Sequence, residues 1–540
     1  MNRIFIILLI AACVQLSAAQ EKLDTAAIVK IKDEGMNHSQ VMEISSWLAD
    51  VYAPRLNWSP EYRKAADWAA AKLKEFGAEN IHFENFSPVG KGWSLKKFYF
   101  NVTEPQVFPV IAYPRAWSPG TKGTISSEVI FLNAATEEEL AKFHGKLKGN
   151  LVLISEPVSV KPHFQPDAAR QADSVLLNLA NRNAFGQGKF GRPQPDSASM
   201  QRVLFYTKKV EFCQKEGAAA ILDANPGDDG TLLYVQGAVV PQSQQIPGDF
   251  TSTRKNPYEA DASPLIPQVT VAAEHYNRMV RALQKETRVK AEMRLDVEPS
   301  NVDSSFNILA EIPGTDLKNE VVLIGGHFDT WHSGTGATDN GSGVAVCMEA
   351  IRILKKLGLQ PRRTIRVGLW GGEEEGLLGS RAYVRNHYAE RPDTGRGQGM
   401  NASDPLIVKP EDSLFCVYFN NDHGGGRVRG MYLQGNEATR AIFRSWFSVF
   451  ADPTAQTLSV INTGGTDHLS FDAVGLPAFQ FIQDQMDYGS RTRHANMDVY
   501  ERLVEDDMKQ AASIMAMCAY NAAMRDSLFP RKPMPLPTAR

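Results

Sequence analysis

The sequence predicts an α/β protein in which one chemistry-bearing domain is interrupted by a second domain. From about residue 292 onward, short apolar runs typical of strands alternate with helical patterns. Between about 124 and 290 the pattern changes to short buried strands separated by polar segments with few candidate catalytic groups. At 540 residues the chain is also too long for one simple core.

Helices are expected between residues 40 and 78, where apolar residues recur at helical spacing and Gly77 follows the last of them. Strands are expected at 98–102 and 107–112, before a Pro- and Gly-rich boundary at 114–123. The predicted domains are a signal peptide (1–19), the N-terminal part of a catalytic domain (20–123), an inserted domain (124–290), the rest of the catalytic domain (291–528) and a tail (529–540).

Within the inserted block, strands are predicted at 129–132 and 151–154, followed by a helix at 209–215 and a strand that ends near 222. The segments 160–205 and 223–264 are expected to be long loops, because they are polar and rich in Gly, Pro, Gln and Asp. The tail from Phe529 is rich in Pro and Arg and is expected to be loosely ordered.

The first residues resemble a secretory signal. Arg3 precedes an apolar run at 4–12, and 17–19 resembles a signal-peptidase site, so cleavage after Ala19 and a secreted or periplasmic protein are expected. A lipoprotein anchor at Cys13 is the alternative, which requires an unusually short signal. No later segment is apolar over about 18 residues, so no membrane span is expected.

The formal net charge of -3 gives no electrostatic reason to expect nucleic acid or anionic lipid as a partner. The four cysteines beyond the signal are widely scattered, so neither a disulfide framework nor a structural zinc site is expected. They are Cys213, Cys347, Cys416 and Cys518.

Candidate catalytic side chains follow four predicted strands at the point where each strand ends. They are His327 and Asp329 after the strand 321–324, the three glutamates Glu373, Glu374 and Glu375 after 364–370, the group Asn420, Asn421, Asp422 and His423 after 414–419, and Arg493 and His494 in the loop after 478–482. Asp339 joins them from the Gly-rich loop 334–343, which precedes a predicted helix at 344–357. Active sites of open α/β sheets form at the carboxyl ends of the strands, where these groups would converge.

Two imidazoles and several carboxylates form a ligand set suited to zinc, and also to manganese or cobalt. One carboxylate can bridge two cations about 3.5–4 Å apart, each also held by one His and one acid. A spare Glu beside a ligand Glu can then act as general base. Asp329, two residues after His327, is expected to fix the tautomer of that imidazole. Three glutamates in a row are by themselves more typical of a solvated helix face. The prediction of a metal site therefore rests on the placement of all these groups after predicted strands.

The remaining histidines divide into two groups. His332, His423 and His468 lie near the candidate site in sequence and could contact a substrate. The others are expected to be surface or packing residues: His38, His82, His144, His163, His275 and His387.

These segments resemble metallopeptidase family 28, the co-catalytic zinc exopeptidases. The matching residues are 326–329, 337–343, 373–380, 466–468 and 494–498, with flanks at 329–331 and 358–364 that resemble the carboxypeptidase Q branch. The likeness is strong from about 292 to 520 and weak at 53–56. The inserted block resembles a protease-associated domain at 216–219. The resemblance implies a three-layer α/β/α sandwich with a mixed, mostly parallel central sheet, interrupted by that domain.

The resemblance also implies roles, with two Zn²⁺ per chain. His327 and Asp422 would hold one zinc, Glu374 and His494 the other, with Asp339 bridging, Glu373 as general base, and Asp329 and Asp467 in supporting positions. Glu373 would take a proton from a water that bridges the metals and pass it to the leaving amine. The family pattern leaves Glu375 as the variable residue. His423 could compete with Asp422 as a ligand.

The predicted function is that of a secreted zinc-dependent exopeptidase acting on terminal peptide bonds of short peptides or dipeptides. A single-zinc glutaminyl cyclase-like enzyme and a non-catalytic, receptor-like relative are the alternatives, and the complete ligand set with its base disfavours both. Arg491 and Arg493 could bind a substrate carboxylate or could lie on a surface loop, so amino- and carboxypeptidase action both stay open. The inserted block could shape substrate access or form a homodimer contact.

Overall fold

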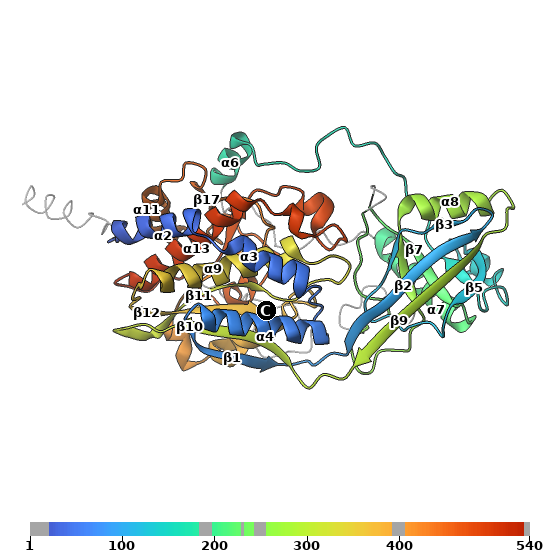
Figure 1. The fold of residues 1–540 in the computed structure, drawn as a ribbon, viewed down its shortest axis with the longest axis horizontal. Coiled ribbons are helices and arrows are strands. Elements are labelled where there is room, and N and C mark those ends of the chain that lie inside the picture. Colours follow the sequence, from blue (N-terminus) through green and yellow to red (C-terminus); the bar gives the residue numbers. More distant parts are fainter. Residues whose placement is uncertain (1–20, 183–196, 228–231, 242–254, 391–405, 534–540) are drawn as a thin grey trace, which may run out of the picture.

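The computed structural model describes residues 21–182, 197–227, 232–241, 255–390 and 406–533. They form two lobes, each built around an eight-stranded sheet (Figure 1). The larger lobe contains the N-terminal helices and the chain beyond residue 305, and the smaller lobe contains most of the chain between 92 and 300. The predicted signal peptide lies outside the described residues.

The sheet of the larger lobe is mixed. Its order is β1 (Glu79–Phe86), β10 (Ser305–Ile312), β12 (Arg363–Trp370), β11 (Leu317–His327), β15 (Phe415–Asn420), β18 (Ala478–Gln483), β16 (Val428–Tyr432) and β17 (Thr457–Ser459). Neighbours are parallel from β12 through β11 and β15 to β18, and again between β16 and β17. The other three pairs are antiparallel. The mixed, mostly parallel sheet is as predicted.

Helices cover both faces of this sheet. One face carries α2 (Thr25–Asn37), α3 (Val41–Ser46), α4 (Pro60–Glu75), α9 (Ser342–Lys356), α11 (Arg440–Phe450) and α13 (Glu505–Met524), and the other carries α10 (Leu378–His387) and α12 (His468–Asp472). The strands alternate accordingly: Ile308 and Ala310 of β10 pack on the first face and Leu309 on the second. The three-layer α/β/α sandwich is therefore confirmed. A short hairpin, β13 (Ala389–Glu390) with β14 (Ile407–Val408), follows α10.

Local sequence explains where the helices begin. The Ser59 hydroxyl accepts a hydrogen bond from the Tyr62 N–H, and Pro60 occupies the first turn of α4, where a missing N–H costs nothing. Helix α9 is buried from Ser342 to Leu354 because α2, α3 and α13 pack around it. This burial explains its apolar residues on all sides.

The sheet of the smaller lobe joins segments that are far apart in sequence. Its order is β3 (Phe108–Pro109), β2 (Gly92–Glu104), β9 (Lys290–Ser300), β5 (Ile125–Phe131), β6 (Leu151–Leu153), β7 (Ala220–Ala224), β8 (Gln268–Val271) and β4 (Ala112–Pro114), and its helices are α5 (Glu137–Ala141), α7 (Ser197–Lys215) and α8 (Ala273–Leu283). The long β2–β9 pair begins beside the larger lobe (Figure 1). Strands within 92–114 and 290–300 therefore belong to the sheet of the smaller lobe, although they lie outside the limits predicted for the inserted domain. Those limits, 124 and 290, stay a prediction.

A strap of residues 160–181 crosses from the smaller lobe to the larger one (Figure 1). The expectation of one long loop over 160–205 was wrong, because α6 (Asp173–Ala180) and the start of α7 lie within it. Leu176 and Leu179 of α6 are buried against Ile461 and Ile482 of the larger lobe. A helix that buries its apolar side only on another lobe gives a weak sequence signal.

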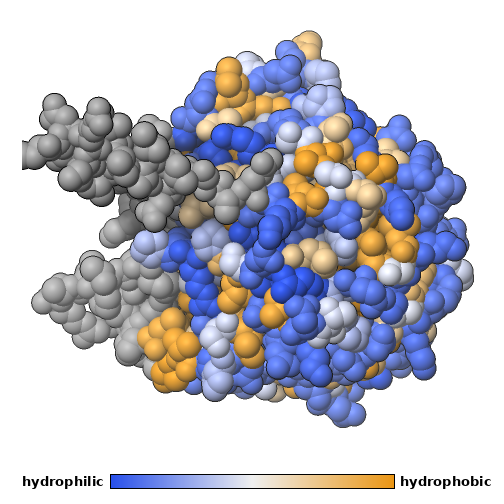
Figure 2. Space-filling model, turned by 90° about the vertical axis from the view of Figure 1, so that its left-hand side faces the viewer, coloured by the Kyte–Doolittle hydropathy of each residue, from blue (hydrophilic) through white to orange (hydrophobic). Residues whose placement is uncertain are grey.

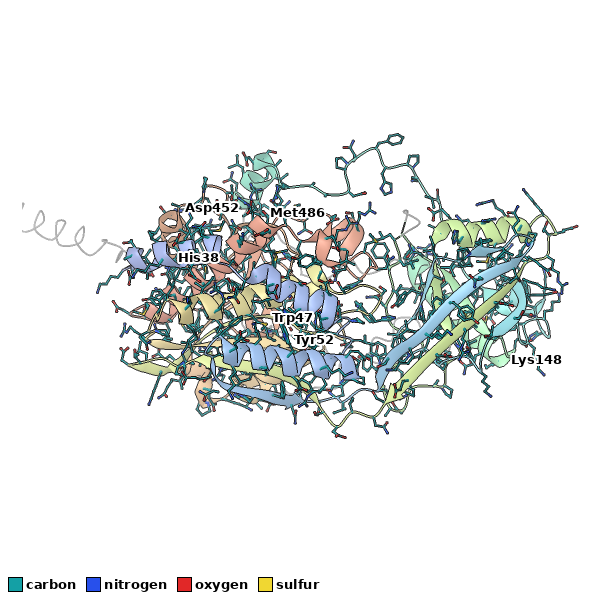
Figure 3. All side chains as sticks on the ribbon, viewed as in Figure 1. His38, Trp47, Tyr52, Lys148, Asp452 and Met486 are labelled. Carbon is teal, nitrogen blue, oxygen red and sulfur yellow. The ribbon has the colours of Figure 1, made fainter. Side chains whose placement is uncertain are left out.

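Polar contacts fasten the strap. The Arg170 guanidinium lies 2.9 Å from Asp484 and 2.8 Å from Asp507, both buried. Ala169 pairs with Met486 through backbone hydrogen bonds. Figure 3 shows Met486 on the side of the larger lobe over which the strap runs. The middle of the strap therefore lies beside the segment 484–491.

The beginning of the tail is packed, contrary to expectation. Phe529 is buried against the rings of Phe443, Trp446 and Phe479, because an aromatic side chain next to an apolar helix face gains from burial. Residues 534–540 lie outside the described residues.

Three further features concern the surface of the larger lobe, the cysteines and the character of the helices. Figure 2 shows the outer end of the larger lobe, where hydrophilic residues predominate and hydrophobic ones occur in small groups. All four cysteines beyond the predicted signal are buried free thiols. Among the helices described, none combines the length and apolar character that crossing a membrane requires.

Candidate metal centre

The parallel strands bring the predicted side chains to one edge of the larger sheet. His327 is the last residue of β11, Glu373 and Glu374 follow β12, Asp422 follows β15, and His494 lies beyond β18. Because β12, β11, β15 and β18 run in the same direction, their carboxyl ends lie together.

Asp339 lies between the two imidazoles. Its Oδ1 atom is 3.2 Å from Nε2 of His327, and its Oδ2 atom is 3.4 Å from Nε2 of His494. His327 Nε2 also lies 3.5 Å from Asp422 Oδ1, and His494 Nε2 lies 3.0 Å from Glu374 Oε2. Each imidazole thus faces one acid of its own and one oxygen of the shared Asp339.

These groups fit a divalent cation. One ligand atom each from His327, Asp339 and Glu374 lies within 4.8 Å of the others. Asp339 Oδ2, Glu374 Oε1 and Asp422 Oδ1 are buried and accept no hydrogen bond within the described residues. Buried carboxylate oxygens are costly unless a donor or a cation satisfies them. The mixed nitrogen and oxygen donor set suits zinc.

The pKa values of two acids at the site are shifted in opposite directions. Burial, followed by the charges of Glu374 and Asp422, raises the pKa of Glu373 well above its ordinary value, although His327 opposes this. Burial also disfavours ionisation of Asp339, but the hydrogen bond from His327 and the charge of His494 lower its pKa to about 2. Such a pair, with pKa values driven apart, is typical of a ligand next to an acid–base residue.

Asp329 supports the cluster differently from the prediction. Its carboxylate accepts hydrogen bonds of 3.1 Å from the backbone N–H groups of both Glu373 and Glu374. The His327 Nδ1 atom lies 2.9 Å from the backbone oxygen of Asp329 and 3.8 Å from its carboxylate. The carbonyl therefore selects the tautomer, and the carboxylate orients the glutamate turn.

Two further residues hold the loop that carries Asp339. The Asp498 carboxylate accepts hydrogen bonds from the backbone N–H groups of Thr338 and Asp339, at 2.6 and 3.0 Å. The buried Arg55 guanidinium donates to the backbone oxygens of Phe328, at 2.9 Å, and Gly336, at 3.1 Å. Both lie in segments that carried the family resemblance, but only backbone geometry reveals their roles.

The other candidates form no ion pair with the predicted ligands among the described residues. Asp467 is fully buried at the start of α12, and burial raises its pKa to about 7. His332 contacts the Pro114 oxygen at 2.8 Å, and His468 contacts Gln434 at 2.8 Å. Of the three nearby histidines, His423 alone lines an open cavity at the cluster.

Two cavities flank the cluster. One, of about 820 Å³, is lined by Trp117 and Tyr258 of the smaller lobe and by Trp331 and Glu374 of the larger lobe. The other, of about 700 Å³, lies within the larger lobe and is lined by Glu373, Asp422, His423 and Tyr488, among others. Arg493 and His494 line both. A bound molecule could therefore extend to both sides of the cluster.

Comparison with known proteins places this arrangement in a family. The sequence model "Peptidase family M28" matches residues 307–519, which include all the predicted ligands. This segment of the chain is therefore similar to peptidase family M28. Human carboxypeptidase Q is 24% identical over 507 residues, which cover 94% of this chain and 90% of that protein. The mouse protein of the same name is also 24% identical, over 506 residues, with the same coverage.

Solved structures of similar proteins share the fold. A peptidase M28 precursor from Shewanella amazonensis has a TM-score of 0.63 and 21% identity, and the alignment covers 94% of this chain and 99% of that one. A zinc aminopeptidase from Bacillus subtilis has a TM-score of 0.53 and 16% identity, with coverage of 91% and 98%. The family match and the carboxypeptidase Q relatives confirm the predicted enzyme class, a metallo-exopeptidase.

Proposed function

We propose that this chain is a family M28, zinc-dependent exopeptidase that hydrolyses terminal peptide bonds of short peptides or dipeptides. The observation that carries the proposal is the placement of Asp339, which presents one carboxylate oxygen to each of two imidazoles. The names of the relatives, carboxypeptidase Q and a zinc aminopeptidase, support the same reaction and the same metal.

Two zinc ions would share Asp339. His327 and Asp422 would hold one ion, and Glu374 and His494 the other, since each imidazole already lies within 3.5 Å of its acid. Zinc supplies Lewis-acid chemistry, which lowers the pKa of water and polarises a carbonyl group. The carboxylate charges would compensate much of the positive charge of the ions.

Glu373 would act as the general base. It lines the cavity beside Asp422 without being in the three-residue ligand cluster, and its raised pKa suits a group that must take up a proton and release it again. It would take a proton from the attacking water and deliver it to the leaving amine as the C–N bond breaks. The Asp329 carboxylate would hold its backbone in place during both transfers.

A cationic side chain favours recognition of a substrate carboxylate. Arg493 is exposed and lines both cavities next to the cluster, whereas Arg491 forms an ion pair of 3.0 Å with Asp167 of the strap. We infer that Arg493 binds the carboxylate of a free C-terminus, as carboxypeptidase or dipeptidase action requires. The smaller lobe would shape access, because Trp117 and Tyr258 line the first cavity.

The alternatives have less support. A single-zinc, cyclase-like site would not need the half formed by His327 and Asp422, and a receptor-like relative would not need Glu373. All of these side chains lie at the same edge of the sheet.

The test is a peptidase assay with added zinc on matched free, N-blocked and C-amidated dipeptides. We expect cleavage of the free and N-blocked substrates and little cleavage of the amidated one, and a kcat about 10³-fold lower for Glu373→Gln. Glu375→Gln is the matched control, because the Glu375 carboxylate accepts from Asn57 instead. Intact substrates, or equal rates for wild type and Glu373→Gln, would refute the exopeptidase proposal. Cleavage of the C-amidated but not the N-blocked substrate would reverse the assignment of the terminus.

Export is the last part of the proposal. The charged start, apolar run and small residues of 1–19 support a cleaved signal and a secreted or periplasmic enzyme. N-terminal sequencing of the mature protein is expected to begin at Gln20. Recovery of intact Met1, or of a lipid-modified Cys13, would contradict it.

A further inference from the structure

We propose that Gln236, a residue of the smaller lobe, is a positioning residue for His494, so that the smaller lobe completes the metal centre. This inference rests on the proposed zinc site. It concerns a contact between residues that are 258 positions apart, with an Nε2–Nδ1 distance of 3.0 Å.

The backbone around Gln236 is held from two sides. On the side of the metal centre, the Val235 N–H donates to the His494 oxygen at 3.1 Å, and the Asn496 N–H donates to the Leu233 oxygen at 3.1 Å. On the other side, the Ala116 N–H donates to the Gln236 oxygen at 3.1 Å. The segment therefore docks on the ligand loop through main-chain hydrogen bonds, and the Gln236 side chain is not needed for docking.

The two nitrogens of His494 face different groups. Nε2 faces Glu374 and Asp339, so it is the nitrogen that would bind metal. An imidazole that binds metal through one nitrogen carries its proton on the other, and that N–H needs an acceptor. The acceptor at Nδ1 would be the amide oxygen of Gln236, because half a turn of the amide exchanges its oxygen and nitrogen.

The amide of Gln236 can present either its oxygen or its nitrogen to His494. It is exposed in the first cavity, and within the described residues its amide makes this one hydrogen bond. Among the described residues, no other hydrogen bond therefore fixes which end of the amide faces His494. With zinc at Nε2, His494 would carry its proton on Nδ1, and this N–H would favour the orientation in which the Gln236 amide oxygen faces it.

Three variants test the inference. Gln236→Met keeps the length of the side chain but removes the acceptor, whereas Gln236→Glu keeps an acceptor that supports metal-bound imidazoles well. Gln284→Met is the matched control, since Gln284 is exposed at the end of α8 in the smaller lobe. Zinc affinity is measured on the full chain by competition with a chromogenic chelator, and thermal unfolding is followed with excess chelator.

We expect Gln236→Met to weaken zinc binding at one site by about 10-fold, in line with the loss of such a partner elsewhere. Gln236→Glu and Gln284→Met should bind zinc within about 3-fold of wild type, and all four proteins should unfold at the same temperature in chelator. Equal zinc affinities of wild type and Gln236→Met would overturn this inference alone. Equal losses in Gln236→Met and Gln236→Glu would also overturn it, because a carboxylate should rescue the contact. Absence of zinc uptake by wild type would overturn the proposed function as well.

Discussion

The His327 half of the centre is enclosed by the larger lobe, whereas the His494 half lies where the two lobes meet. The side chain of His327 is 1% exposed, and a backbone oxygen two residues away fixes its tautomer. The side chain of His494 is 16% exposed, lines both cavities and contacts Gln236 of the smaller lobe. Residues of the larger lobe alone thus surround the first half, whereas the second half also contacts the smaller lobe.

The strap adds contacts that hold the segment before His494. The strap brings Asp167 to Arg491 and Arg170 to Asp484, so the segment that leads to His494 is held from the smaller lobe. His332 adds a contact to the Pro114 oxygen across the same junction. Substitutions in the residue that both halves share, in one half, or at the junction of the lobes therefore test how the two halves differ.

The largest effect is expected at the residue that both halves share. Asp339→Asn keeps the shape of the side chain but removes the charge that would face both metal ions. We expect kcat/KM to fall by more than about 10³-fold and zinc affinity to fall at both sites. Peptide hydrolysis and zinc titration measure this, and a variant that loses only one of two zinc ions would show that the halves do not share Asp339.

The next effect belongs to the His327 half. Asp422→Asn is expected to weaken one zinc site by about 100-fold and to leave the His494 half filled, because Asp422 Oδ1 faces His327 alone among the two imidazoles. His423→Asn is the matched control, since His423 lines the same cavity but forms no ion pair among the described residues. Zinc analysis in which the His423 variant loses the metal instead would reverse the ligand assignment.

Removal of Arg55 is expected to destabilise the fold beneath both halves. Arg55→Met removes the donor of the Phe328 oxygen and leaves the Gly336 oxygen with only the Gly341 N–H, in a region that is fully buried. The expected cost is about 3 kcal/mol in the free energy of unfolding, measured by urea denaturation in chelator. Arg55→Lys should cost less, as it keeps one charged donor, and an unchanged stability for Arg55→Met would refute this support.

The smallest effect concerns pH at the junction. Burial lowers the pKa of His332 to about 4 from an ordinary value of 6.5, although the contact with Pro114 opposes this. Between these pH values the unfolded chain binds a proton at His332 that the folded chain does not bind, so stability falls as the pH falls from 6.5 to 4. In His332→Gln that slope should be shallower by up to about 1.4 kcal/mol per pH unit. Identical slopes in urea titrations would contradict the assignment.

Much of the larger lobe could be predicted, because short stretches of its sequence are enough to indicate each strand and the side chains that follow it. The strand runs before His327 and Glu373 are apolar and short, and the groups that follow them lie at one sheet edge by the geometry of parallel strands. The five ligand candidates and Glu373 therefore came from sequence alone, and the structure brings their side chains together. Their roles stay proposals until metal is measured.

The supporting residues could not be predicted, because they act through long-range or backbone contacts. Asp498 and Arg55 bind main-chain groups, which no side-chain pattern encodes. Gln236 lies in a segment expected to be a loop, and its partner His494 is 258 residues away. The two leucines of α6 are buried only because the strap crosses to another lobe. Each of these depends on how the lobes pack, which follows the local pattern only weakly.

The most direct test is the zinc content of the purified wild-type chain after dialysis against zinc, counted by native mass spectrometry. Two zinc ions per chain are predicted, because Asp339 faces two imidazoles that each have a further acid. One zinc ion per chain, or none, would contradict the shared-carboxylate centre.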